Sequence, residues 1–242
     1  MESYKEKFQS LESTQKEKKF VPQEINLHFE HKFIFDLCIH PKVIEAAKSL
    51  LGPNIVLLSS TVFTKYPAEN SKPAQFVGWH QDLKYWGLVS ATSSRIKLAS
   101  MWLAIDKADA DNGAMKFIKG SHKQGFIDHV DTLEEGNVLN ENQDIILKPE
   151  WRENIVQTEL LPGECTFHDG MLVHGSSATL SQRRMGLTAQ FCQPQVIMEP
   201  MKYTKTQAFV EDFRKPILIH GDDNFGKLQY FNISEDNYQY QV

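Results

Sequence analysis

The chain has 242 residues, of which 41% are hydrophobic, and it carries a formal net charge of −5 with a sequence pI near 6.0. This length is enough to bury a substantial core in one β-rich domain, and the acidic balance disfavours nucleic acid as a partner. No apolar run approaches the roughly 20 residues of a membrane span, and no apolar signal segment precedes the first predicted elements. We therefore expect a cytoplasmic monomer or homodimer that binds neither a membrane nor nucleic acid.

The first part of the chain predicts helices. Residues 1–20 form a charged segment that we expect to be helical or frayed. A helix is predicted from His40 to Leu51, with Pro41 near its N-terminus and Gly52-Pro53 ending it. The apolar positions on its expected buried face are Val43, Ala46, Ala47 and Leu50.

Strands are predicted after this helix. Ile55 to Thr64 is β-branched and apolar, and Lys97 to Asp106 and Arg184 to Cys192 alternate in polarity. Turn residues cluster between them, as at Asp109 to Gly113. A short helical front followed by many strands favours a mainly β fold with flanking helices, either a sheet sandwich or a small barrel.

We expect a single domain over residues 1–242, with a polar insertion loop and a C-terminal extension. Asp131 to Glu153 is the predicted loop, which could lie over the functional site, and residues 200–242 form the extension. The cysteines Cys38, Cys165 and Cys192 are odd in number and lack CxxC spacing, so we expect free thiols in a reducing compartment.

A metal site is predicted from two separated motifs. Gly78-Trp79-His80-Gln81-Asp82 places His80 and Asp82 two residues apart, so in an extended chain both side chains point to one side. His174 follows far downstream, before Gly175-Ser176. Two imidazoles and one carboxylate can bind one face of an octahedral ion and leave three positions open, as iron(II) oxygenases require. A His-x-Asp pair alone is weak support, because such tripeptides arise by chance.

The context of these motifs resembles the phytanoyl-CoA dioxygenase family, over about His40 to Phe191. The resemblance rests on ordered motifs: Trp79 to Asp82 followed by Tyr85-Trp86, Met101 to Asp106, Asp111 to Met115, Gly120 to His122, and His174 to Ser176 with Arg183-Arg184 downstream. It implies a double-stranded β-helix, the cupin-like jelly roll. It also implies that His80, Asp82 and His174 are the catalytic metal ligands, with Fe(II), the cosubstrate 2-oxoglutarate and O2 as cofactors.

An anchor for the far carboxylate of 2-oxoglutarate is predicted on the strand after His174. Arg184 shares a face with Gly186, Thr188 and Gln190, whereas Arg183 lies on the apolar side, where we expect it to reach solvent. The family arginine usually lies about one residue further from the distal histidine, where this chain has Met185. We infer a one-residue deletion in the turn and place this role on Arg184, with Arg183 as the alternative. The resemblance also assigns Ser176 to the carboxylate.

Several residues have two interpretations. Trp102 matches an aromatic wall of the cosubstrate site, but core packing explains it equally well. His168 could be mistaken for the distal ligand, although the Gly-Ser that follows His174 favours His174. Tyr85 and Trp86 could line a substrate pocket or pack in the core. Lys65 and Arg95 could meet an anionic substrate, but we expect solvated surface charges.

The reaction implied is hydroxylation of an unactivated C–H bond in a small metabolite or natural-product intermediate. Desaturation and cyclisation stay open, whereas halogenation is disfavoured because related halogenases have a small residue where this chain has Asp82. Two rival classes are a non-catalytic relative that binds a metal or small molecule, and a cupin-like metalloenzyme that needs no cosubstrate.

Overall fold

The computed structural model describes residues 2–16, 23–68, 73–132, 134–139, 143–199, 216–233 and 238. The α-helices are α1 (Glu2–Lys16), α2 (Lys32–Cys38) and α3 (Pro41–Leu51). The strands are β1 (Gln23–Ile25), β2 (Ile55–Lys65), β3 (Val77–His80), β4 (Leu88–Ser90), β5 (Leu98–Ala104), β6 (Met115–Ile118), β7 (Val130–Asp131), β8 (Gln143–Asp144), β9 (Ile155–Thr158), β10 (Cys165–Asp169), β11 (His174–Ser176), β12 (Arg184–Cys192), β13 (Val196–Met198) and β14 (Ile217–His220). Short 3-10 helices include η1 (Leu27–Phe29), η2 (Asp82–Tyr85), η3 (Ser121–Gln124) and η5 (Pro149–Asn154).

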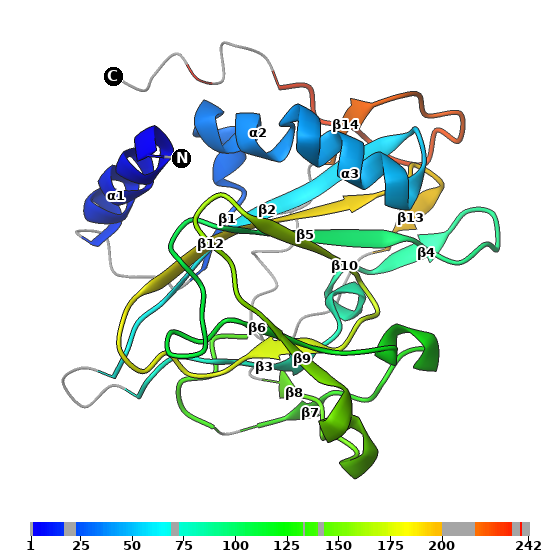
Figure 1. Cartoon of the computed structure of the whole chain (residues 1–242). Helices are drawn as coiled ribbons and strands as arrows, with labels where there is room; N and C mark the ends of the chain where they lie inside the picture. Colours follow the sequence, from blue (N-terminus) through cyan, green and yellow to red (C-terminus); the bar gives the residue numbers. More distant parts are fainter. Residues whose placement is uncertain are drawn as a thin grey trace.

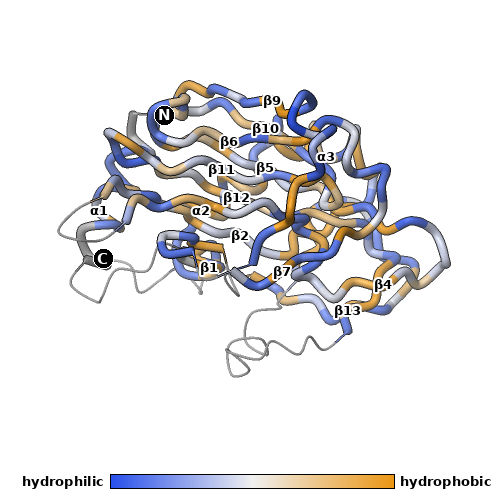
Figure 2. The backbone as a smooth tube through the Cα atoms, turned by 90° about the horizontal axis from the view of Figure 1, so that it is seen from below, coloured by the Kyte–Doolittle hydropathy of each residue, from blue (hydrophilic) through white to orange (hydrophobic). Residues whose placement is uncertain are grey.

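Ten of these strands form two antiparallel sheets that face each other (Figure 1). The larger sheet has the order β1-β2-β12-β5-β10, with β14 also on β2, and the smaller sheet has the order β3-β11-β6-β9. The chain moves between the sheets as it passes from β2 to β12, so neighbours within a sheet are distant in sequence. This arrangement is the jelly roll that we predicted, and the strands of the larger sheet follow one another in the same order in Figure 2.

Helices α2 and α3 cover the outer face of the larger sheet (Figure 1). The predicted helix is confirmed, but its buried face differs from the expected one. Val43, Ala47 and Leu51 are buried, whereas Leu50 is 48% exposed. A spacing of four residues keeps the three buried side chains on one stripe of the helix, and Leu50 lies about 100° away from Leu51.

The two faces of strand β12 point in different directions, one toward the hydrophobic core under the helices and the other toward the space between the two sheets. Met185, Leu187, Ala189 and Phe191 pack into the core under the helices. Because strand side chains alternate, Arg184, Gly186 and the other even-numbered residues face the interior, as predicted. Gly186 lies where a Cβ would come within 2.2 Å of the Trp102 indole, so only glycine leaves room for that ring.

Outside the two sheets, the structure adds detail to the predicted loop and helices. The segment from 131 to 153 contains β8 and η5, and it packs against β3 through hydrogen bonds. Helix α2 was not predicted. Residues 200–215 of the predicted C-terminal extension lie outside the described residues. The cysteines are free, and no helix in the described ranges combines the length and apolarity that crossing a membrane demands.

Candidate metal centre

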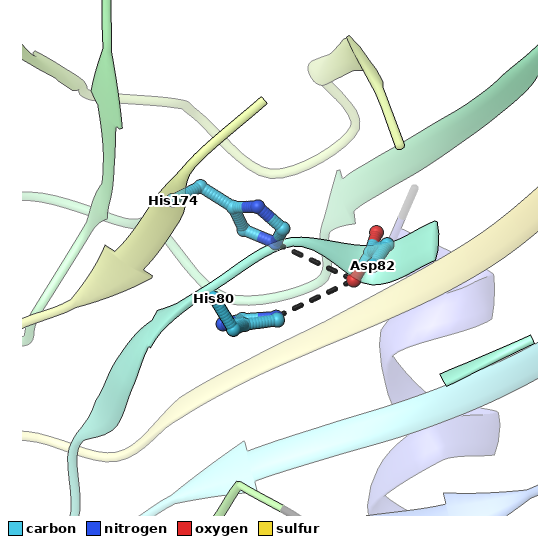
Figure 3. A group of neighbouring side chains, drawn as sticks. All are labelled: His80, Asp82 and His174. Carbon is cyan, nitrogen blue, oxygen red and sulfur yellow. Dashed lines mark ion pairs between the residues drawn. The ribbon is translucent and has the colours of Figure 1, made fainter. Parts of the chain in front are cut away.

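The structure brings His80, Asp82 and His174 together between the two sheets (Figure 3). His80 ends β3 and is paired with His174 of β11 in the register of the smaller sheet. Their Nε2 atoms lie 3.3 Å and 3.6 Å from Oδ1 of Asp82. The candidate ligand atoms all lie within 4.8 Å of one another, which is close enough to share one ion.

Local backbone geometry aims these side chains. Strand β3 ends at His80, and Gln81 keeps an extended conformation before Asp82 begins η2. Successive side chains therefore still point to opposite sides past the end of the strand, so His80 and Asp82 share a side as expected. The Nδ1 atom of each histidine lies 2.9 Å from a carbonyl oxygen two residues earlier, that of Gly78 for His80 and that of Leu172 for His174. These contacts leave both Nε2 atoms directed at the shared point.

The electrostatics of the three residues suit a cation. Burial alone would raise the pKa of Asp82, but its interactions with His174, His168 and His80 hold it well below its usual range. Burial and the neighbouring His80 keep the pKa of His174 well below its usual value. The favoured forms are thus an ionised carboxylate and a neutral imidazole, which are the forms that bind metals.

A third histidine lies beside this group. His168 of β10 contacts Asp82, but through the other carboxylate oxygen, Oδ2, at 3.3 Å. Ser100 of β5 donates to the same Oδ2 at 2.5 Å. The structure therefore places His168 next to the three candidate ligands without making it one of them, in line with our preference for His174.

Arg184 lies in the interior, as predicted for the anchor. It is 1% exposed, donates to the carbonyl oxygen of Gly113 at 2.9 Å, and stacks its guanidinium 4.7 Å from the centroid of the Trp102 ring. Its Nε is buried with no hydrogen-bond partner among the described residues. Burial lowers the pKa of Arg184 to about 9, and the charge of Asp106 opposes this shift only in part.

Lys65 is a second buried basic group beside Arg184, and our expectation of a solvated surface charge is wrong. Its Nζ donates to the Gly113 and Ser177 carbonyl oxygens and to Oγ of Ser176, at 3.0, 2.6 and 2.8 Å. Burial, then the charges of Arg184 and Lys116, lower the pKa of Lys65 to about 5. Sequence reasoning named Lys65 as a possible partner for an anion but expected it in solvent, because a lysine at the end of a strand normally reaches solvent.

Arg183 reaches solvent as expected, but only in part, with 23% of its side chain exposed, because ion pairs hold it. Its guanidinium forms a two-point ion pair with Asp106, with both contacts at 2.9 Å, and it also contacts Glu12 of α1. Asp106 additionally accepts the backbone N–H of Met185. Arg183 therefore ties the start of β12 to its surroundings, which leaves Arg184 as the arginine that faces the interior.

The remaining candidates divide between the site and its surroundings. The Tyr85 ring lies 6.2 Å from that of His80, and its hydroxyl bonds to Gln143 of the 131–153 segment. That segment therefore lies beside the metal ligands. Trp86 packs in an apolar cluster at one end of the interior. Arg95 stays at the surface, paired with Asp169.

Comparison with known proteins places these residues in a family context. The family model described as Phytanoyl-CoA dioxygenase (PhyH) matches residues 3–186. A Caenorhabditis elegans protein named probable phytanoyl-CoA dioxygenase is 27% identical over 62% of this chain and 47% of its own length. A Stutzerimonas stutzeri protein named probable alpha-ketoglutarate-dependent hypophosphite dioxygenase is 30% identical over 66% of this chain and 52% of its own.

The chain spans about half the length of the curated relatives it matches. Among solved structures, the apo form of the non-heme monooxygenase ThoJ superposes with a TM-score of 0.68 at 22% identity, covering 88% of this chain and 70% of that one. At this identity the likeness concerns the fold, and it agrees with the jelly roll described above.

Proposed function

The chain belongs to the phytanoyl-CoA dioxygenase family, and from this we propose that it is an iron(II)- and 2-oxoglutarate-dependent oxygenase. The reaction that we propose is hydroxylation of an unactivated C–H bond in a small polar metabolite or natural-product intermediate. One observation carries the proposal: three convergent metal-ligand side chains lie next to two buried basic groups, Arg184 and Lys65, that contact no carboxylate among the described residues.

The donor set fits iron(II). His80, Asp82 and His174 would supply two neutral nitrogens and one anionic oxygen from one side, which leaves the opposite positions for other ligands. Iron(II) bound there together with 2-oxoglutarate would supply the activation of dioxygen for C–H oxidation. The protein's own part is to fix these three atoms on rigid strands and to shield them from bulk water.

The two buried basic groups fit the far carboxylate of 2-oxoglutarate. Ser176, which bonds to Lys65, follows His174 by two residues on β11. Such a pair in a strand is separated by about 7 Å, and a five-carbon dicarboxylate spans a comparable distance. One end of the cosubstrate could therefore bind at the metal while the other meets Lys65 and Arg184, and it would neutralise the unpaired charge of Arg184.

Trp102 would form the wall of this site. Its indole is 1% exposed, lies under the Arg184 guanidinium, and occupies the space that Gly186 leaves open. Stacking on the ring holds the guanidinium in one plane, so its N–H groups are oriented before a carboxylate arrives. This role and core packing are compatible, because the same ring does both.

A polar substrate is supported by Gln190. This side chain is 8% exposed and faces the interior opposite Ser100, which bonds to Asp82. Its Oε1 is buried without a hydrogen-bond partner in the described part of the chain. A buried acceptor in this state costs about 1–3 kcal/mol, so a donor group on a bound molecule would be favoured. The hypophosphite named for one relative is likewise small and polar.

An anaerobic titration tests the proposal. Protein loaded with iron(II) should develop a weak visible charge-transfer band when 2-oxoglutarate is added, and it should release succinate once oxygen is admitted. A library of polar metabolites, screened by succinate release and by mass detection of products heavier by one oxygen atom, would then identify the substrate. Failure of the folded, reduced protein to bind iron(II), or product formation without 2-oxoglutarate, would refute the proposal.

A further inference from the structure

The two oxygens of the Asp82 carboxylate have different surroundings. Oδ1 faces the Nε2 atoms of His80 and His174, at 3.3 and 3.6 Å. Oδ2 receives the Ser100 hydroxyl at 2.5 Å and lies 3.3 Å from Nε2 of His168. Only Oδ1 is therefore directed at the point that the three candidate ligands share.

Ser100 and His168 come from adjacent strands of the larger sheet. They are register partners on β5 and β10, so their side chains point to the same side. Both are buried, with 1% and 7% of their surface exposed. The His168 ring is also confined by Phe117 and His174, with ring centroids 5.2 and 4.3 Å away. The two donors are thus fixed by the sheet and by packing.

The histidines at this site differ in which nitrogen is anchored. His80 and His174 hold Nδ1 against a backbone carbonyl and present Nε2 to the shared point. His168 does the reverse, because its Nε2 meets Asp82 and its Nδ1 is buried without a hydrogen-bond partner in the described ranges. An ionised carboxylate only accepts hydrogen bonds, so Nε2 of His168 must carry the proton. That nitrogen has no lone pair for a metal.

We propose that Ser100 and His168 are positioning residues that make Asp82 a one-oxygen ligand. Their hydrogen bonds hold Oδ2 away from the metal, so the carboxylate neither rotates nor binds through both oxygens. Coordination positions opposite the three ligands then stay open for the cosubstrate and oxygen. This inference rests on the proposed function, because it takes Asp82 as a metal ligand.

Hydrogen bonds to a metal-binding carboxylate or imidazole typically change metal affinity by about 10–100-fold when they are removed. We therefore expect Ser100→Ala and His168→Phe each to raise the Co(II) dissociation constant by about 10-fold or more, measured by anaerobic calorimetry. Ser100→Thr and His168→Gln retain a donor and should recover most of the affinity. Thr166→Val is the matched control, since Thr166 lies on the same face of β10 with no hydrogen bond to Asp82 among the described contacts.

The visible spectrum of bound Co(II) provides a readout that loss of packing alone would not change. Its intensity depends on the number of ligands, so a carboxylate that binds through both oxygens should alter the bands of Ser100→Ala and His168→Phe. Thermal unfolding of the metal-free variants separates misfolding from weakened binding. If the donor-retaining variants bind Co(II) no better than Ser100→Ala and His168→Phe, the positioning role is wrong.

The outcomes distinguish this inference from the proposed function. If the wild-type protein does not bind Co(II), the metal site itself is refuted and the positioning role with it. If the wild-type protein binds Co(II), and Ser100→Ala and His168→Phe bind it with the same affinity and spectrum, only the positioning role is refuted. Weaker binding with altered bands, restored by the donor-retaining variants, is the result that we expect.

Discussion

Replacing Arg184 by methionine should weaken cosubstrate binding without lowering the stability of the ligand-free protein. The guanidinium is fully buried, and its contacts are the Gly113 carbonyl and the Trp102 ring rather than a carboxylate. Truncating one partner of a buried hydrogen-bonded charge pair costs about 2–5 kcal/mol. The dissociation constant of 2-oxoglutarate should therefore rise by about 30-fold to several thousand-fold.

The ligand-free protein should not lose stability in this variant. Replacing even a buried ion pair by apolar residues of similar volume is often neutral or stabilises by about 1–4 kcal/mol, and Arg184 lacks the direct counter-charge that such a pair has. For a chain of this size, each kcal/mol corresponds to roughly 2–4 °C in Tm. We expect the Tm of Arg184→Met without ligand to equal or exceed that of the wild type. Saturating 2-oxoglutarate should raise the Tm of the metal-loaded wild type but not that of the variant.

Differential scanning calorimetry with and without 2-oxoglutarate measures both effects. Arg183→Met is the control, because it breaks the ion pair with Asp106 and should lower the Tm while preserving the shift caused by 2-oxoglutarate. A wild-type cosubstrate shift in Arg184→Met would refute the assignment of the anchor. A fall of several degrees in its ligand-free Tm would contradict the stability prediction, because it would show that other groups stabilise the buried guanidinium in the ligand-free protein.

Three further predictions concern the same interior. Burial lowers the pKa of Lys65 to about 5, whereas a lysine in the unfolded chain titrates near about pH 10. Between these two pH values the unfolded chain binds a proton that the folded chain lacks, so the free energy of unfolding should rise with pH. Urea unfolding of wild type and Lys65→Met at several pH values should differ in slope by up to about 1.4 kcal/mol per pH unit, and equal slopes would contradict the burial of a lysine. Gly186→Ala would place a Cβ 2.2 Å from the Trp102 ring and should lower stability by about 1–3 kcal/mol in chemical denaturation, an effect that Trp102→Phe in the same chain should partly relieve. Asp82→Ala should abolish Co(II) uptake in calorimetry while the metal-free protein stays folded, and wild-type affinity would exclude this carboxylate as a ligand.

Features that depend on short stretches of chain could be predicted from the sequence. The alternation on β12 placed Arg184 and Gly186 on one face, and the His80-x-Asp82 spacing placed two candidate ligands on one side. Both follow from the two-residue period of an extended backbone, which neighbouring residues determine. The α3 helix was predicted for a similar reason, although its buried stripe includes Leu51 rather than Leu50.

Other features were decided only when strands far apart in sequence paired. Lys65 meets Ser176 across 111 positions, and His168 meets Asp82 across 86. Arg183 pairs with Asp106 across 77 positions. No local pattern encodes such contacts, because they depend on which strands become neighbours in the two sheets.

The sequence by itself therefore determined the identity of the three candidate ligands and the side of β12 that faces them. The tertiary structure decided which basic side chains are buried, namely Lys65 beside Arg184, and which residues hold the Asp82 carboxylate. The physical reason is that side-chain direction along a strand is a local property of the backbone, whereas burial and hydrogen-bond partners are set by the packing of two sheets against each other.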